Sequence, residues 1–290
     1  MRPTLRRNRL EAAMPESTRK PIKLILTDID GTILPYGQGT VSDACRRAFH
    51  AALDAGIRIG PASGRGAARV APVFSGDEAC CKTVLASNGM EVYLDGLLVH
   101  ESHLEREDII ALADATRELE GCGVICFDGP QALVVSGTIE NLRKSFPAYA
   151  PTARYVDEIP RKPIVKTNAF TPVDDQVTLH VLEFLRSRVP HIDYSMPQPG
   201  FVNMTPHGWN KGEAVKLLCR QLGIELEQAV VFGDAGNDVE MLSAVPNSVA
   251  VAGAAPDAKA AARWHIGAVE DDAVPAAIDA LARGKWPFTE

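Results

Sequence analysis

Four aspartates follow two apolar runs of the chain. Asp28 and Asp30 come directly after "LILT", and Asp234 and Asp238 come after "AVVFG". Close like charges raise one another's pKa and destabilise a fold, so a crevice that gathers these side chains needs a cation. Mg²⁺ prefers oxygen ligands and is usually held by one or two carboxylates together with a substrate phosphate. The aspartates therefore indicate a magnesium site, where one carboxylate is also suited to attack phosphorus.

Three other segments carry polar groups that suit a phosphoryl group. Ser63 and Gly64 open "SGRGAA", where a hydroxyl and free backbone N–H groups at a predicted helix start would face an anion. Lys211 begins the helical pattern "KGEAVKLL" and offers an ammonium that neutralises developing charge. Asn237 is a candidate N-cap of "DVEMLSAV" that also reaches the metal or the phosphate. The role of Arg65 stays open between substrate contact and a structural ion pair.

The elements that position these groups alternate between strand and helix patterns. Apolar, β-branched runs such as "IKLILT", "IRIGPA" and "AVVFG" are separated by helical patterns such as "SDACRRAFHAALDAG" and "AARVAPVF". This alternation predicts an α/β fold with a Rossmann-like parallel sheet covered on both faces. Ligands of such sheets bind beyond the carboxyl ends of the strands. Asp28, Ser63 and Asp234 are therefore expected at one edge of the sheet.

The middle of the chain has a different pattern. "EVYLDGLLVH" and "GVICFDGPQALVV" each read as two strands around a turn, which is typical of antiparallel hairpins. An inserted α+β cap domain is therefore predicted over 91–199, with the core formed by 21–90 and 200–290. Residues 1–20 are basic and polar and are predicted to be a disordered tail. In the cap, Lys166 and Asn168 stay open between substrate contact and solvated polar groups.

Composition excludes several classes of protein. The chain has 290 residues, of which 46% are hydrophobic, and a formal net charge of −7. The negative charge argues against a surface for nucleic acid or anionic lipid. No apolar run approaches the roughly 20 residues of a membrane span. The six cysteines have no repeated spacing, so buried free thiols in the cytoplasm are expected.

The motifs taken together resemble those of one family. "DIDGT", "ASGR", "NKG" and "GDAGNDVEM" occur in the order and spacing of the four motifs of the haloacid dehalogenase superfamily. "SNG" at 87–89 is similar to the Cof-type phosphatases, which carry a type IIB cap. The resemblance extends from Ile22 to Leu281. It implies the same fold, a Rossmann-like core with an inserted α+β cap.

The resemblance implies a role for each residue. Asp28 would be the nucleophile, and Asp30 would protonate the leaving oxygen and then activate water. Ser63 and Lys211 would hold the phosphoryl group. Mg²⁺ would be held by Asp28, by the backbone carbonyl of Asp30, and by Asp234 and Asp238. Substrate or phosphate contacts are expected from Gly31, Ser63, Gly64, Asn88, Gly89, Lys211 and Asn237.

The expected activity is that of a cytoplasmic, magnesium-dependent phosphatase acting through an aspartyl-phosphate. The substrate would be a small phosphorylated metabolite, with sugar phosphates favoured, and the protein would be a monomer or homodimer. Two alternatives stay open. A phosphotransferase or phosphomutase on the same core would pass the phosphoryl group to a sugar hydroxyl. A non-catalytic regulator would bind the phosphometabolite without turnover.

Overall fold

The computed structural model describes residues 19–289. The tail predicted over 1–20 therefore lies outside the described residues, apart from its last two. These two contact the core, because Lys20 forms an ion pair with Glu225 and the Arg19 guanidinium lies 4.2 Å from the ring centre of Trp286. The prediction of a disordered tail is wrong for Arg19 and Lys20. None of the helices in 19–289 combines the length and apolarity that a membrane crossing requires.

The core is built on a parallel sheet of five strands in the order β14-β13-β12-β1-β2. The central strand β1 is completely buried, which explains why its sequence is apolar without alternation. The strands are β1 (Leu24–Thr27), β2 (Arg58–Pro61), β12 (Ala229–Gly233), β13 (Ser248–Ala250) and β14 (Trp264–His265). The predicted Rossmann-like α/β core is confirmed.

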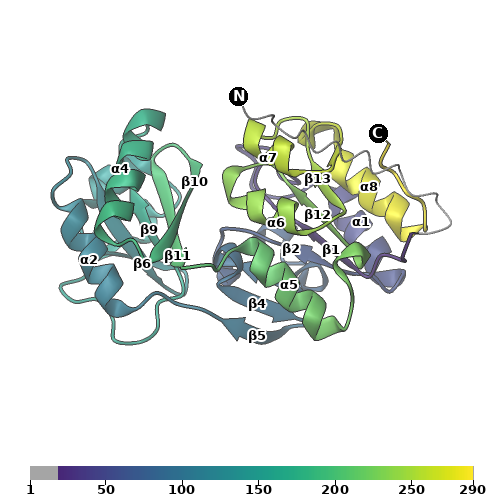
Figure 1. The fold of residues 1–290 in the computed structure, drawn as a ribbon, viewed down its shortest axis with the longest axis horizontal. Coiled ribbons are helices and arrows are strands. Elements are labelled where there is room, and N and C mark those ends of the chain that lie inside the picture. The colour runs from purple at the N-terminus through teal and green to yellow at the C-terminus, as the bar shows by residue number, and fades with distance from the viewer. Residues whose placement is uncertain (1–18, 290) are drawn as a thin grey trace, which may run out of the picture.

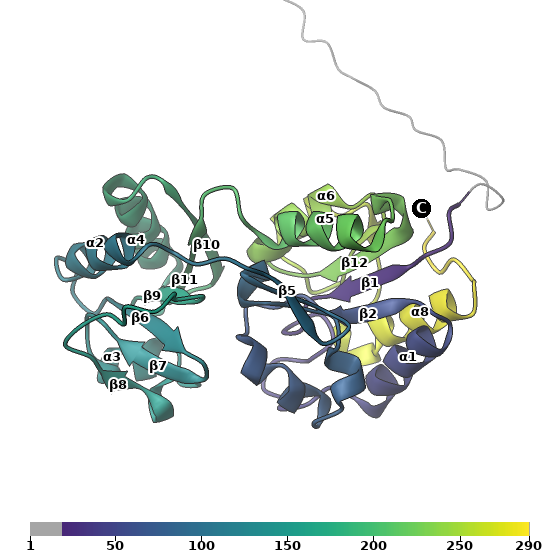
Figure 2. The ribbon, with the colours of Figure 1, turned by 90° about the horizontal axis from the view of Figure 1, so that it is seen from below.

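Helices cover both faces of this sheet. Figure 2 shows α5 and α6 on one face and the paired helices α1 and α8 on the other. Helix α1 begins directly after Ser42, whose hydroxyl caps it by accepting a hydrogen bond of 3.0 Å from the N–H of Cys45. The helices are α1 (Asp43–Asp54), α5 (Lys211–Leu222), α6 (Val239–Ala244), α7 (Pro256–Ala261) and α8 (Ala273–Ala282).

One predicted helix of the core does not form. The segment "AARVAPVF" folds into two 3₁₀ turns, Ala67–Arg69 and Ala71–Phe74, because Pro72 has no N–H to continue a helix. A further 3₁₀ turn, Glu78–Cys81, follows before the short strand β3 (Val84–Ala86). The segment after Ser63 is therefore a compact loop that stays close to the edge of the sheet.

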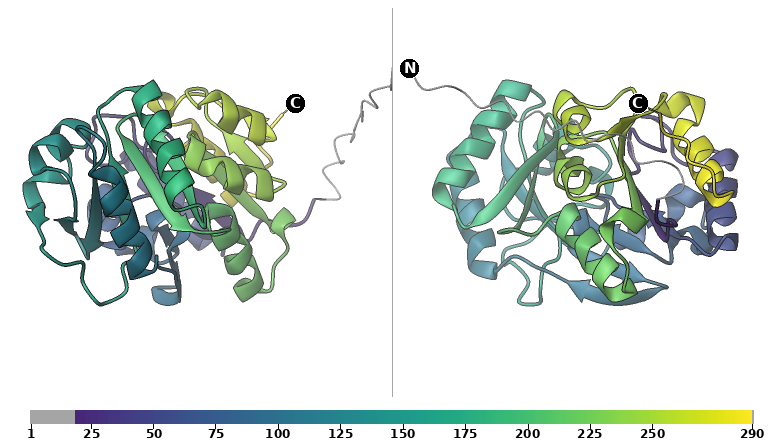
Figure 3. Two further views of the ribbon diagram at one scale, coloured as in Figure 1. Left: turned by 60° about the vertical axis from the view of Figure 1, so that its left-hand side comes forward. Right: turned by 45° about the vertical axis from the view of Figure 1, so that its right-hand side comes forward.

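The inserted cap is a six-stranded sheet in the order β10-β11-β9-β6-β7-β8. Helices α2 and α4 pack on one face, and the opposite face carries α3 (Figures 1 and 2). The strands are β6 (Gly123–Asp128), β7 (Gln131–Val134), β8 (Arg154–Tyr155), β9 (Thr167–Phe170), β10 (Ile192–Gln198) and β11 (Phe201–Pro206). The helices are α2 (Arg106–Thr116), α3 (Ile139–Ser145) and α4 (Asp175–Arg188). The cap stands beside the core in each view of Figure 3.

The hydrogen-bonding of the strands shifts both predicted boundaries of the cap. The hairpin β4 (Glu91–Leu94) and β5 (Leu97–Glu101) pairs with β3, and Val92 packs in the core cluster. It was assigned to the cap because a hairpin pattern does not say which sheet it joins. Strand β11, assigned to the core, pairs with β9 and β10 instead. We therefore propose a cap from residue 102 to residue 206.

Candidate active site

The carboxyl ends of three strands meet at one edge of the core sheet. The N–H of Asp28 donates to the carbonyl of Phe232 at 2.9 Å, and the N–H of Ala62 donates to the carbonyl of Thr27 at 2.8 Å. These bonds continue the parallel pairing by one residue beyond β1. They bring Asp28, Asp234 and the loop that begins at Ser63 to the same edge, as the sequence predicts.

Three of the four aspartates form a buried cluster. Ligand atoms of Asp28, Asp234 and Asp238 all lie within 4.8 Å of one another. The Lys211 ammonium lies between two of them, 2.6 Å from a carboxylate oxygen of Asp28 and 2.6 Å from one of Asp238. The side chains of Lys211 and Asp238 are fully buried. Two salt bridges therefore join the start of α5 to the ends of β1 and β12.

The cluster carries more negative than positive charge. Three buried carboxylates face one ammonium, which leaves a formal excess of two negative charges. Burial, with the neighbouring carboxylates adding to it, raises the pKa of Asp28 well above its usual range. Burial and Asp238 raise the pKa of Asp234 to about 6. Burial alone would lower the pKa of Lys211, but Asp238 and Asp28 outweigh it and raise that pKa.

Asp238 closes the turn after β12. One of its carboxylate oxygens accepts the N–H of Asp234 at 3.0 Å and that of Ala235 at 3.1 Å, while the other binds Lys211. Asn237 was predicted to be an N-cap, but α6 begins only at Val239 and the Asn237 side chain donates to Asn88 at 3.1 Å. The acceptor for the backbone of this turn is therefore Asp238, whose carboxylate has enough lone pairs for all three bonds.

Asp234 is held by two hydroxyls that were not among the expected site residues. Thr32 donates to one carboxylate oxygen at 2.9 Å, and Tyr36 donates to the other at 3.2 Å. Gly31 lies beneath this group with a φ of +86°, and a Cβ there would lie 2.3 Å from an Asp234 oxygen. Its own N–H donates to the carbonyl of Leu34, so Gly31 makes room for Asp234. Thr32 is part of the "DIDGT" motif, whereas no sequence signal marks Tyr36.

Asp30 stands apart from the buried cluster. Its carboxylate accepts two hydrogen bonds from the Arg65 guanidinium, at 2.6 and 2.8 Å, and its side chain is 42% exposed. Arg65 therefore forms the ion pair that was one of its two alternatives, and it also lines the crevice described below, so substrate contact stays a prediction. The side chain of Asp30 does not join the group that could hold a metal.

A crevice of about 200 Å³ lies between this edge and the cap. The Ser63 hydroxyl accepts the N–H of Arg65 at 3.2 Å, which folds the loop against the crevice floor. The core contributes among others Asp28, Asp30, Ser63, Gly64, Arg65 and Asn237, and the cap contributes among others Phe146, Tyr149, Lys166, Phe201 and Asn203. The crevice has room for a small molecule and exposes both the buried carboxylate and the Asp30–Arg65 pair.

Four of the residues expected to contact substrate do not line this crevice, namely Gly31, Asn88, Gly89 and Lys211. Asn88 accepts the hydrogen bond from Asn237 described above, and its N–H donates to the carbonyl of Ser63 at 2.9 Å. Gly89 packs against α5, where a Cβ would lie 2.7 Å from that of Ala214. We therefore assign Asn88 and Gly89 a positioning role behind the site.

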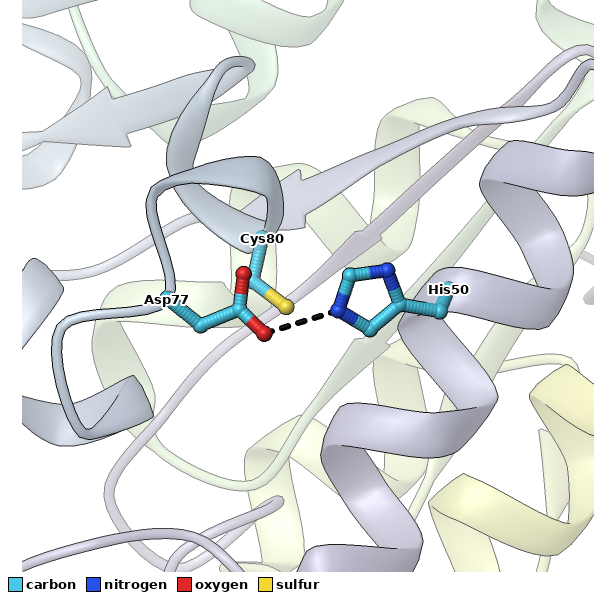
Figure 4. Close-up of side chains that lie close together, drawn as sticks. All are labelled: His50, Asp77 and Cys80. Atoms are coloured by element: carbon cyan, nitrogen blue, oxygen red, sulfur yellow. Dashed lines mark hydrogen bonds and ion pairs between the residues drawn. The ribbon is translucent and has the colours of Figure 1, made fainter.

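A second group of potential ligands lies elsewhere on the core. Figure 4 shows His50 of α1 facing Asp77, with a distance of 2.7 Å between His50 Nε2 and the carboxylate, and Cys80 beside them. The three side chains do not line the crevice between core and cap. Of the two groups, the aspartate cluster is therefore the one that reaches the crevice, through Asp28.

The aspartate cluster fits a magnesium ion. Its donors are carboxylate oxygens, which Mg²⁺ prefers, and its uncompensated negative charge is what a divalent cation would neutralise. Asp28, Asp234 and Asp238 are the side chains that would hold the ion. Lys211 binds one carboxylate oxygen of Asp28 and one of Asp238, whereas the two oxygens of Asp234 accept hydrogen bonds only from the neutral hydroxyls of Thr32 and Tyr36.

Comparisons with known proteins agree with this geometry. The model of the haloacid dehalogenase-like hydrolases matches residues 25–278. A 5-amino-6-(5-phospho-D-ribitylamino)uracil phosphatase of Escherichia coli is 24% identical over 93% of this chain and 99% of its own. A phosphoglycolate phosphatase of Pyrobaculum aerophilum is 28% identical over 83% and 87%.

Solved structures show the same fold. A subclass IIB sugar phosphatase superposes with a TM-score of 0.77 at 23% identity, covering 88% of this chain and 97% of its own. A haloalkanoate-superfamily phosphatase of Bacteroides thetaiotaomicron has a TM-score of 0.78 at 22% identity, covering 93% and 98%. The match extends through core and cap, so the two-part architecture is shared.

Proposed function

Since the chain belongs to the haloacid dehalogenase-like hydrolases, we propose that it is a magnesium-dependent phosphatase that hydrolyses a small phosphate monoester. The observation that carries the proposal is the arrangement around Asp28. Its carboxylate opens into the crevice, is held by the Lys211 ammonium at 2.6 Å, and lies across from the proton-transfer candidate Asp30. A nucleophile, a cation and an acid–base group at one strand end are the parts that phosphoryl transfer through a carboxylate needs.

The proposed reaction has two steps. In the first, an oxygen of Asp28 forms a bond to phosphorus as the bond to the alcohol oxygen breaks, and Asp30 protonates that oxygen. In the second, Asp30 takes a proton from water, which attacks phosphorus and releases phosphate from Asp28. The ion pair with Arg65 positions the Asp30 side chain at the crevice. Its action as an acid requires this pair to open.

The remaining residues of the site position the reacting groups and neutralise negative charge. Lys211 orients the nucleophile and offsets part of the negative charge on the transferring group. Ser63 and the adjacent Gly64 line the crevice. A bound Mg²⁺ would supply the positive charge that the three buried carboxylates lack. The cap covers the crevice and limits the access of bulk water.

We propose sugar phosphates as the favoured substrate class. The support is the size of the crevice, about 200 Å³, and the fold shared with a subclass IIB sugar phosphatase. The names of the two relatives, a phosphoribitylamino-uracil phosphatase and a phosphoglycolate phosphatase, also describe small phosphorylated metabolites. A cytoplasmic monomer or homodimer stays our prediction.

A phosphate-release screen tests the proposal. The purified protein is incubated with sugar, nucleotide and cofactor monoesters, each with Mg²⁺ and with excess EDTA, and inorganic phosphate is measured. We expect release from at least one sugar phosphate that stops in EDTA. Transfer to an added sugar without free phosphate would indicate the phosphotransferase alternative. Binding without any turnover would indicate a non-catalytic regulator.

A further inference from the structure

Lys166, which directly precedes β9, is a buried cation of the cap that the proposed reaction does not use. Only 8% of the residue is exposed. Its ammonium donates to the carbonyl of Gly64 at 2.6 Å and to the hydroxyl of Tyr149 at 2.8 Å. It also lies 4.9 Å and 5.0 Å from the ring centres of Phe127 and Tyr149. All of these partners are neutral, and they leave one of the three N–H donors of the ammonium free.

A second cation, Arg69, lies over the aromatic ring of Tyr149 that Lys166 also contacts. The Arg69 guanidinium lies 4.5 Å from the ring centre of Tyr149 and donates to the carbonyl of Ala148 at 3.2 Å. Ion pairs are formed at nitrogen-to-oxygen distances of up to 4.0 Å. Within residues 19–289, no carboxylate oxygen lies this close to a side-chain nitrogen of Lys166 or Arg69. The neighbouring acid Asp128 is paired with Lys162. A buried charge is normally paired, so Lys166 without a counter-ion, with the half-buried cation Arg69 beside it, points to a bound anion.

The location of these cations identifies the anion. Arg69, Tyr149 and Lys166 line the crevice that contains Asp28 and also an adjoining cavity of about 430 Å³. They therefore lie where the two spaces meet, with Tyr149 and Lys166 contributed by the cap and Arg69 by the core. The proposed function already provides Lys211 and the metal site for the transferred phosphoryl group. A molecule whose phosphoryl group lies at Asp28 reaches Lys166 with the part that leaves as the alcohol.

We infer that Lys166 and Arg69 bind a second acidic group of the substrate, a carboxylate or a second phosphate, carried by the alcohol part. This inference rests on the proposed function and narrows it to phosphate monoesters with two anionic groups, such as phosphorylated sugar acids. The Lys166 contact with Gly64 also joins cap and core beside Ser63. An anion bound to Lys166 therefore lies where the cap contacts the core and is enclosed when the cap covers the crevice.

Pairs of substrates that differ in one group test the inference. 6-Phosphogluconate and sorbitol 6-phosphate share a carbon skeleton but end in a carboxylate or an alcohol, as do 3-phosphoglycerate and glycerol 3-phosphate. We expect kcat/KM to favour the acid by about 10- to 100-fold in at least one pair, the range of a hydrogen bond to a charged group. Lys166→Met should remove this preference mainly through KM, and Lys166→Arg should retain most of it.

The controls separate this subsite from general damage. Lys144→Met removes an exposed lysine of the cap helix α3 that lines neither the crevice nor the adjoining cavity, and it should leave the acid-to-alcohol ratio unchanged. Arg69→Met, at a half-buried position, should lower the ratio even if Lys166→Met fails to fold. The inference is overturned if the wild type shows no preference in either pair, or if Lys166→Met lowers both members of a pair equally.

A binding measurement separates the failure of this inference from the failure of the proposed function. Calorimetry with the Asp28→Asn variant reports affinity for 6-phosphogluconate and sorbitol 6-phosphate without turnover. Tighter binding of the acid that depends on Lys166 supports the subsite even if no phosphate is ever released. Equal binding of the two compounds contradicts the subsite even if the protein is an active phosphatase.

Discussion

Replacing Asp234 by asparagine should stabilise the metal-free protein while removing its response to magnesium. Asp234 is 6% exposed, and burial together with Asp238 raises its pKa from 3.8 to about 6. At 1.36 kcal/mol per unit, the charged form costs the folded state about 3 kcal/mol at pH 7.5. Asparagine removes the charge and can still accept the hydrogen bond from Thr32. Because its amide replaces the acceptor for Tyr36, we expect a net gain of about 1 to 3 kcal/mol.

Thermal unfolding in EDTA measures this gain, which corresponds to a rise in Tm of about 2 to 6 °C. The sign of the pH dependence follows from the raised pKa. The cost of the charge is fully present above pH 6 and disappears as the carboxyl becomes protonated, so the difference in Tm should shrink as the pH falls from 7.5 toward 4. Excess Mg²⁺ should raise the Tm of the wild type and have much less effect on the variant.

Asp114→Asn is the matched control, because Asp114 lies on the surface of α2 in an exposed pair with Arg117. Its Tm should stay within about 1 °C of the wild type, since exposed ion pairs contribute little. The reasoning is refuted if Asp234→Asn lowers the Tm in EDTA at pH 7.5, or if the difference in Tm is independent of pH.

Three further substitutions test individual parts of the site. Asp30→Asn should lower kcat for a sugar phosphate by about 10²- to 10⁴-fold, and less for p-nitrophenyl phosphate, whose leaving group needs no proton; equal losses would exclude Asp30 as the acid. Gly31→Ala should raise the Mg²⁺ concentration for half-maximal activity at least tenfold by displacing Asp234, whereas Gly37→Ala, with the same φ of +86° but open space around it, should not. Lys211→Met should lower the free energy of unfolding in EDTA by about 3 to 5 kcal/mol, because two buried carboxylates lose their counter-ion, and an unchanged denaturation midpoint would contradict the salt bridges described above.

Much of the core could be predicted from the sequence, because its signals are local. A fully apolar "LILT" followed by polar residues shows where a buried strand leaves the core, and the same holds for "AVVFG" before Asp234. The Asp95–Gly96 turn was also predictable, since both residues adopt a positive φ that this dipeptide tolerates. Parallel strands place their ends at one edge, so the clustering of Asp28 and Asp234 followed from topology alone.

Features that depend on contacts between distant segments of the chain could not be predicted from the sequence. The strand patterns of β4 and β11 do not state their partners, so the hairpin was placed in the cap and β11 in the core. Tyr36 reaches Asp234 across 198 positions of the chain, and nothing in its neighbourhood announces that contact. For Lys166, the sequence left two alternatives, substrate contact and a solvated charge. The structure shows its ammonium buried against Tyr149.

The most direct test of the central claim is the covalent route through Asp28. Wild type and Asp28→Asn are compared for magnesium-dependent phosphate release, and acid-quenched wild-type protein is examined by mass spectrometry for a phosphorylated peptide that contains residue 28. We predict that the variant stays folded, as its near-wild-type Tm would show, that it releases no phosphate above background, and that only the wild type carries the modification. Substantial turnover by Asp28→Asn, or phosphorylation at another residue, would contradict the account.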